Sequence, residues 1–213
     1  NYAALYEHAL DHLRATDPDP AARLHEWRSE RPENRTDSDL LAEYAWVVVS
    51  CGMTAHVTGR LWPRLTSAFR GWNPAAVAAS PLDVQEALSV LKHPRKIGAI
   101  LSLADSLDRQ PGQMQRLAGM PTSEALAWMQ TLPWVGPVSR YHLARNLGWD
   151  VVVRSGPVVR LAACLGCTPD ELVHETAARV GERIRVVDLV LWNWAHQVGD
   201  RRMKEMASLF RLM

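Results

Sequence analysis

The segment Leu132 to Ser139 has residue types and spacing that suit it to hold a phosphate. Pro133 and Gly136 break the helical pattern there, and a second helix is expected over residues 137–147. The first backbone N–H groups of a helix have no partners within it, so they can bind an anion at the positive end of the helix dipole. Contacts of this kind hold a polynucleotide strand without reading its sequence. We therefore expect this turn to be a backbone-binding element.

The run Leu132-Pro133-Trp134-Val135-Gly136-Pro137 resembles the helix-hairpin-helix of the DNA glycosylase superfamily, whose pattern is Leu-Pro-Gly-apolar-Gly-Pro followed by a helix. The resemblance implies an all-α, glycosylase-like fold with two helical lobes flanking a cleft, and double-stranded DNA with a flipped nucleotide as the partner. Trp134 stands where the family has its first glycine, so the close backbone approach that glycine permits is partly lost. The residues expected to contact DNA are Pro133, Trp134, Val135, Gly136, Val138, Ser139, Arg140, Arg145 and Arg154.

A second landmark of the same family lies between Asp150 and Leu161. Alignment on Val158-Val159-Arg160-Leu161 places Ser155 where glycosylases of this type carry an aspartate. That aspartate stabilises positive charge developing on the sugar or orients a water molecule. A neutral serine hydroxyl does neither comparably, and loss of such an electrostatic contribution costs orders of magnitude in rate. The resemblance therefore extends to the fold more firmly than to the reaction.

Lyase chemistry and an iron–sulfur cluster are both disfavoured by the residues present. Val138 stands at the position of the lysine nucleophile of family members that also cut the backbone, so no Schiff base can form there. The [4Fe–4S] cluster of one branch needs four closely spaced cysteines, and the chain has Cys51, Cys164 and Cys167. Cys164-Leu-Gly-Cys167 has no second pair beside it, and the histidines do not share metal-ligand spacing. We expect no metal and no cofactor.

Several functions remain open. Our first choice is a DNA-binding, base-flipping protein that acts on a damaged or modified base, most simply an enzyme without lyase activity that uses Asp150 or Asp188 as its carboxylate. A transferase that modifies phage-type DNA pyrimidines without excision is the second, because loss of the aspartate would protect the glycosidic bond. The third is a non-catalytic reader of modified DNA. An introduced substitution at Ser155 is a further explanation, against which the accompanying Gly156-Pro157 argues.

The candidate catalytic residues are Ser155 at the second landmark and three residues elsewhere whose side chains can titrate. Lys96 belongs to the basic run Lys92 to Lys96. In relatives this region lies beside the cleft, which favours a functional role for Lys96; the alternative is that the run is only a solvent-exposed face. Asp188 lies in an apolar run, where a structural hydrogen bond is the alternative to catalysis. Trp149 is the candidate for a base pocket, which needs an aromatic or apolar face. The full catalytic set is Ser155, Asp188, Lys96 and His142.

Short helices with brief connections are expected to position these residues. Ser38 is the expected N-cap of the third helix, and a short extended stretch is expected at Asp150 to Val153. N-terminal helices over 1–37 are expected to pack on a helical domain over 38–213, with the hairpin near 122–147. Apolar periodicity bounded by Pro, Gly and Asn predicts helices at 2–15, 20–30, 39–50, 54–61, 63–71, 82–91, 94–109, 113–118, 122–131, 137–147, 157–165, 169–180, 183–198 and 200–211.

Composition limits the kind of partner. The 213 residues are 47% hydrophobic and 22% charged, with a net charge of +1. A chain so close to neutral must bind nucleic acid through a local patch. No segment has the roughly 20 successive apolar residues of a membrane span. We expect a monomer without a membrane partner, cytoplasmic and nucleoid-associated when bound to DNA, or phage-encoded and intracellular.

Overall fold

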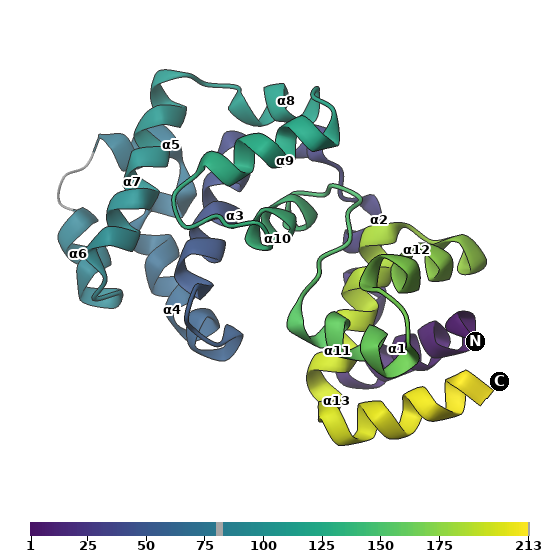
Figure 1. The fold of residues 1–213 in the computed structure, drawn as a ribbon. Helices are drawn as coiled ribbons and strands as arrows, with labels where there is room; N and C mark the ends of the chain where they lie inside the picture. The colour runs from purple at the N-terminus through teal and green to yellow at the C-terminus, as the bar shows by residue number, and fades with distance from the viewer. Residues whose placement is uncertain (80–82, 213) are drawn as a thin grey trace. The chain divides into compact units, whose positions relative to one another are not determined.

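The computed structural model describes residues 1–79 and 83–212, and within these ranges it contains helices and no strand (Figure 1). The expectation of an all-α fold is confirmed. The helices form two compact units, each with its own internal contacts. The continuous unit is Arg31–Leu147, and the discontinuous unit combines Asn1–Glu30 with Gly148–Met213. The division expected from the sequence, at residue 37, stays a prediction.

The continuous unit is built around α3 (Asp37–Ser50). Thr36 and Asp39 form a capping box, in which the Thr36 hydroxyl accepts from the Asp39 N–H at 3.2 Å and the Asp39 carboxylate accepts from the Thr36 N–H at 2.7 Å. The cap is therefore Thr36 and not Ser38. The other helices of this unit are η1 (Pro32–Asn34), α4 (Ala55–Ala68), η2 (Arg70–Trp72), α5 (Pro74–Ala78), α6 (Asp83–Val90), α7 (Pro94–Arg109), α8 (Gln113–Ala118), α9 (Thr122–Thr131) and α10 (Ser139–Asn146).

Helix α4 corrects two expectations at once, because it runs through Pro63 where two separate helices were expected at 54–61 and 63–71. A proline inside a helix removes one hydrogen bond. Buried packing of Leu65, Ala68 and Phe69 holds the helix past this point, and the Trp62 ring stacks on that of Trp72 at 4.8 Å. Helix α5 was not expected. Of the helix expected at 82–91, residue 82 lies outside the described residues.

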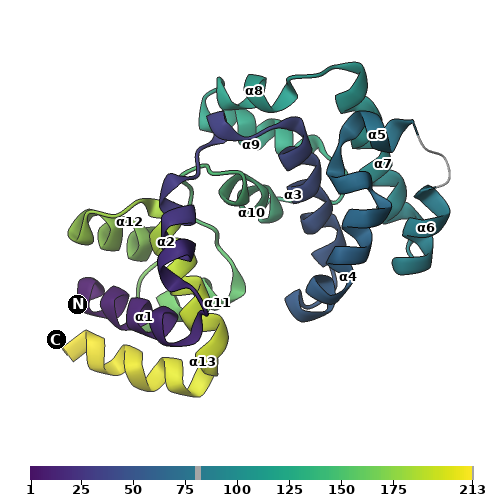
Figure 2. The same cartoon turned by 180° about the vertical axis from the view of Figure 1, so that it is seen from behind.

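The discontinuous unit holds both ends of the described chain. Its helices are α1 (Tyr2–Thr16), α2 (Pro20–Ser29), α11 (Gly156–Leu165), α12 (Pro169–Val180) and α13 (Ile184–Leu212). Helix α1 lies alongside α13 (Figures 1 and 2), and α13 also packs on α11. Helix α13 breaks at Gly199, whose φ is 73°, as the separate helices expected at 183–198 and 200–211 required. The shared core includes Leu5, Leu10, Leu13, Val158, Leu161, Leu172, Val187, Val190, Leu191 and Trp194.

Two arginines at the start of α13 attach the end of α2 to the discontinuous unit. Arg183 donates to the backbone carbonyl oxygens of Arg28 at 3.2 Å and Glu30 at 2.7 Å. The buried Arg185 pairs with the Glu30 carboxylate at 2.5 Å. Arginine satisfies several acceptors with one planar group. These contacts make residues 1–30 part of the unit that residues 148–213 complete.

Every helix in the described part of the chain is too short or too polar to span a lipid bilayer.

Candidate functional site

The hairpin turn, Leu132 to Val138, lies in the continuous unit between α9 and α10 (Figure 1). The Val135 N–H donates to the Leu132 carbonyl at 3.1 Å and closes the first bend. The buried Tyr44 of α3 donates its hydroxyl to the Pro133 carbonyl at 3.0 Å, and burial raises the pKa of Tyr44. Tyr44 was not among the residues predicted for the site, because the carbonyl group that it binds is 89 residues away in sequence. The turn is therefore fixed to the core of its own unit.

The N-terminus of α10 leaves backbone donors open. The Gly136 N–H, expected to contact DNA, donates instead to the Ser139 hydroxyl at 2.7 Å. Within the described residues, the N–H groups of Val138 and Ser139 have no hydrogen-bond partner. They lie at the positive end of the α10 dipole, where an anionic oxygen is favoured. The open donors are therefore at Val138 and Ser139, two and three residues beyond Gly136, at the start of the helix.

Trp134 occupies a conformation that favours glycine. Its φ is +68°, in the left-handed region where a side chain with a Cβ is disfavoured. The residue is 38% exposed. The His93 ring meets the indole nearly at right angles with 5.4 Å between centroids, and the Lys96 ammonium lies 5.5 Å from the indole centroid. The backbone thus keeps the form suited to a glycine while carrying the largest side chain.

Lys96 is buried under this turn, at 3% exposure. Its ammonium donates to the carbonyl oxygens of Val49 at 3.0 Å and Cys51 at 2.5 Å, at the C-terminal end of α3. Carbonyls at a helix end lack intrahelical donors, so a cation there satisfies them and opposes the dipole. Burial lowers the pKa of Lys96. A catalytic role for Lys96 stays a prediction, and it would require the ammonium group to leave both oxygens.

The polar side chains of α10 are largely enclosed, whereas side chains that contact DNA would have to be exposed. Arg145 is 5% exposed, and the half-buried Arg140 stacks its guanidinium on the Tyr141 ring at 4.9 Å. Burial, with a smaller contribution from Arg145, lowers the pKa of His142 to about 4. His142 is therefore neutral at neutral pH. Of the predicted DNA contacts, Val135 is also buried, whereas Val138 is 49% exposed.

The Ser155 loop, residues 150–156, belongs to the discontinuous unit. Ser155 is 6% exposed and occupies the N-cap position of α11 without making the capping bond. Among the described residues its hydroxyl has no hydrogen-bond partner. Asp188 of α13 is fully buried, and its carboxylate accepts from the Val153 N–H at 3.1 Å. The structural hydrogen bond considered for Asp188 is thus present, and it fixes the loop beside Ser155.

The other residues predicted around Ser155 have partners or are covered. Arg154 is exposed and pairs with Asp170 at 2.8 Å and 3.2 Å, which lowers the pKa of that carboxyl. The Asp150 carboxylate accepts from the Arg185 N–H at 2.8 Å, at the first turn of α13. Trp149 is 5% exposed and offers no open ring face. Its place in a base pocket stays a prediction.

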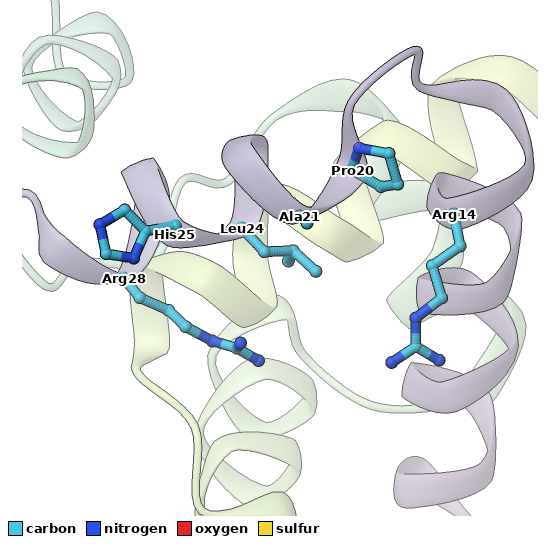
Figure 3. Close-up of a pocket in the computed structure, with 6 residues that line it drawn as sticks. All are labelled: Arg14, Pro20, Ala21, Leu24, His25 and Arg28. Atoms are coloured by element: carbon cyan, nitrogen blue, oxygen red, sulfur yellow. The ribbon is translucent and has the colours of Figure 1, made fainter.

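A cavity of about 370 Å³ lies between α1 and α2 (Figure 3). Arg14 and Arg28 flank it, with Leu24 between them (Figure 3). Both arginines have acidic partners, Asp11 at 2.9 Å and Glu182 at 2.7 Å. The cavity contains none of the predicted site residues. Elsewhere in the described residues, no group of three His, Cys, Asp or Glu side chains is arranged to hold a metal ion.

Comparison with known proteins finds similarity in three dimensions only. No family model matches the sequence, and no curated protein matches it. The crystal structure of the 8-oxoguanine DNA glycosylase of Thermotoga maritima matches with a TM-score of 0.64 at 16% identity, over 94% of this chain and 99% of the other. The 8-oxoguanine glycosylase/lyase of Methanocaldococcus jannaschii, solved with a 15mer DNA containing 8-oxoguanine, matches with a TM-score of 0.61 at 15% identity, over 89% and 95%. The chain therefore has the all-helical helix-hairpin-helix fold of these 8-oxoguanine DNA glycosylases, as its hairpin segment predicted.

Proposed function

We propose that the chain binds double-stranded DNA through the hairpin turn and acts on a damaged or modified base that is flipped out of the duplex. One observation carries the proposal: the Val138 and Ser139 N–H groups are open at the start of α10. Two adjacent amides at a helix N-terminus match the oxygens of a backbone phosphate. The fold shared with two 8-oxoguanine glycosylases, one of them bound to DNA, supports the same function.

The reaction we propose has no strand-cleaving step. Val138 offers no amine for a Schiff base, and Lys96 is engaged at the end of α3. Because residue 155 is a serine, excision would need another residue to supply a carboxylate at the sugar. The candidates are Asp150 and Asp188, and Asp188 already accepts a hydrogen bond from the Val153 N–H of the Ser155 loop. The enzyme would then be a monofunctional glycosylase.

A second candidate, base modification without excision, is favoured by Ser155. Its hydroxyl is buried and unpartnered in the described structure, and a buried polar group without a partner is costly unless something binds it. A neutral hydroxyl can orient a base without promoting cleavage of the glycosidic bond. A protein with either activity would meet DNA in the cytoplasm, at the nucleoid or on phage DNA, and we propose that it does so as a monomer.

Binding is tested by Ser139→Asp, a change that adds a negative charge at the open amides. An acidic residue in the first turn of a helix is favourable, so α10 should fold, while a phosphate should be repelled. We expect duplex affinity, measured by fluorescence anisotropy, to fall about tenfold or more. Thr122→Asp is the matched control, because it adds the same charge at the N-terminus of α9. Equal affinity of the parent and Ser139→Asp at one salt concentration would refute the binding site.

The reaction is tested with duplexes carrying 8-oxoguanine and a panel of modified pyrimidines. Excision would leave an abasic site that hot alkali cleaves, whereas modification would change the nucleoside mass in an intact strand. Mass spectrometry of the nucleosides and gel analysis of the strand separate the two. Tight binding with neither product would identify a reader of modified DNA and would contradict both enzymatic proposals.

A further inference from the structure

We propose that Trp134 is a nucleobase-stacking residue, and that it receives an unstacked base of the strand whose phosphate the hairpin turn holds. The inference rests on the proposed function, since it needs DNA at the hairpin. It goes further by naming the part of the DNA that the turn contacts, the flat face of a base in addition to the backbone. The occupant is therefore DNA in which a base near the turn has left its stack.

The backbone of the turn does not require a tryptophan at this position. At φ +68°, glycine is free of the steric cost that any side chain with a Cβ meets. The Pro133 carbonyl and the Val135 N–H, on either side of residue 134, have partners that do not involve its side chain. The indole is thus additional to what holds the turn. Strained residues of this kind gather at ligand-binding positions.

The indole is also held in place for contact with a ligand. Lys96 lies against its ring at 5.5 Å, and two carbonyl oxygens fix the Lys96 ammonium in turn. The His93 ring lies against the indole nearly perpendicular to it. A side chain that is already ordered loses little conformational entropy when it binds. The remaining 38% exposure leaves aromatic surface available to a base.

The surroundings of Trp134 suit a polynucleotide better than a protein partner. The open amides of Val138 and Ser139 are on the same turn, and Lys92 and Arg95, both exposed, flank His93 in sequence. Positive groups next to an exposed aromatic ring are the combination with which proteins hold unpaired strands. Val138, 49% exposed, adds apolar surface beside the sugar and base.

This arrangement predicts a preference among DNA forms. A base inside a fully paired duplex has its faces covered by its neighbours, so it cannot stack on Trp134. A single strand, or a duplex with a mismatch or a small gap, frees a base at low cost. We expect the preference of the parent protein for such DNA over a fully paired duplex to depend on Trp134.

The experiment compares Trp134→Gly, Trp134→Phe and Met120→Gly with the parent. Glycine suits the φ of residue 134, so Trp134→Gly should fold, and circular dichroism melting checks this. Its affinity for a single-stranded oligonucleotide should fall about tenfold, because base–aromatic stacking is of that strength. Trp134→Phe should restore most of the affinity. Met120→Gly removes a side chain of matched exposure, 37%, in the same unit and should change nothing.

Photocrosslinking identifies the contact directly. An oligonucleotide with 5-bromouracil should crosslink to the peptide containing Trp134, and mass spectrometry should place the adduct on that residue. A crosslink elsewhere, or full affinity of a folded Trp134→Gly, would overturn the stacking proposal. If that variant binds fully while Ser139→Asp does not, the hairpin still binds DNA and only the stacking fails. If neither variant loses affinity, the proposed function fails as well.

Discussion

Trp134 and Val138 of the hairpin turn are exposed to solvent, whereas Ser155 of its loop and Asp188 of α13 are covered. Trp134 is 38% and Val138 49% exposed, whereas Ser155 is 6% exposed and Asp188 is fully buried. The hairpin also has open backbone donors, while the Val153 N–H of the loop is taken by Asp188. One segment can receive a ligand as it is. The other would first have to be uncovered.

The difference between the two segments indicates which functions can be kept when a sequence departs from a family pattern: those that use the backbone, and not those that use a particular side chain. The phosphate binding proposed at the hairpin would use backbone amides, which remain when Trp134 and Val138 stand in place of a glycine and a lysine. Chemistry at the loop depends on a side-chain carboxylate, which a serine does not replace. A distant resemblance can therefore hold for a binding element and fail for a catalytic one.

The largest effect should come from removing the acceptor that keeps the Ser155 loop closed. Asp188→Ala leaves the buried Val153 N–H without a partner and opens a small cavity, so the free energy of unfolding should fall by about 3 kcal/mol. Urea unfolding measures this. Asp200→Ala on the same helix removes an exposed carboxylate paired with Arg160 and should cost less than about 1 kcal/mol. Equal losses in the two variants would mean that the loop is not held by Asp188.

The dependence of stability on pH tests the burial of His142 on α10. Burial, with a smaller contribution from Arg145, holds the pKa of folded His142 at about 4, and the ordinary value is 6.5. Below pH 6.5 the unfolded chain therefore takes up a proton that the folded chain does not. Stability is complete above that pH and is lost as the pH falls toward 4, by about 2 kcal/mol between pH 7 and pH 5.

The control for this series is His142→Gln, which should flatten the dependence, compared with His56→Gln at an exposed histidine, which should not. Urea unfolding at each pH gives the free energies. A dependence that persists undiminished in His142→Gln would mean that the burial of His142 is not its cause.

The smallest effect is expected at Arg154, whose predicted DNA contact competes with Asp170. An exposed ion pair contributes less than about 1 kcal/mol, so Arg154→Ala should leave both stability and duplex affinity nearly unchanged. Arg179→Ala, which breaks the exposed pair with Glu175 on α12, is the matched control. A tenfold loss of affinity in Arg154→Ala alone would mean that Asp170 releases Arg154 to a phosphate. The Ser155 loop would then bind DNA as the hairpin turn is proposed to do.

Local signals in the sequence were enough for most helices. Proline and glycine positions placed the ends of α2, α7, α8, α9 and α12 close to where the structure has them. Pro63 misled the prediction, because burial of the residues after it outweighed the lost hydrogen bond. Asn73 followed by Pro74 was an available signal for α5, since the Asn73 side chain caps that helix and proline suits its first position.

The candidate site was less predictable, because its contacts join residues far apart in sequence. Lys96 was predicted as a catalytic residue, and the partners that the structure gives it, the carbonyl oxygens of Val49 and Cys51, are 47 and 45 residues away. Which amides of the hairpin stay open depends on the Ser139 hydroxyl, which occupies the Gly136 N–H. The pattern identified the turn, and only three-dimensional contacts determine which of its groups are available.

Because Arg183 and Arg185 attach residues 1–30 to the discontinuous unit, the two units fold in a definite order during synthesis. The continuous unit has all its residues once Leu147 has left the ribosome, so it can fold while the chain is still growing. Helix α1, with Leu5, Leu10 and Leu13 uncovered, must wait until α13 has also emerged. During that interval the nascent chain carries a helix whose apolar face lacks its partner, so residues 1–30 are a segment that a chaperone could protect.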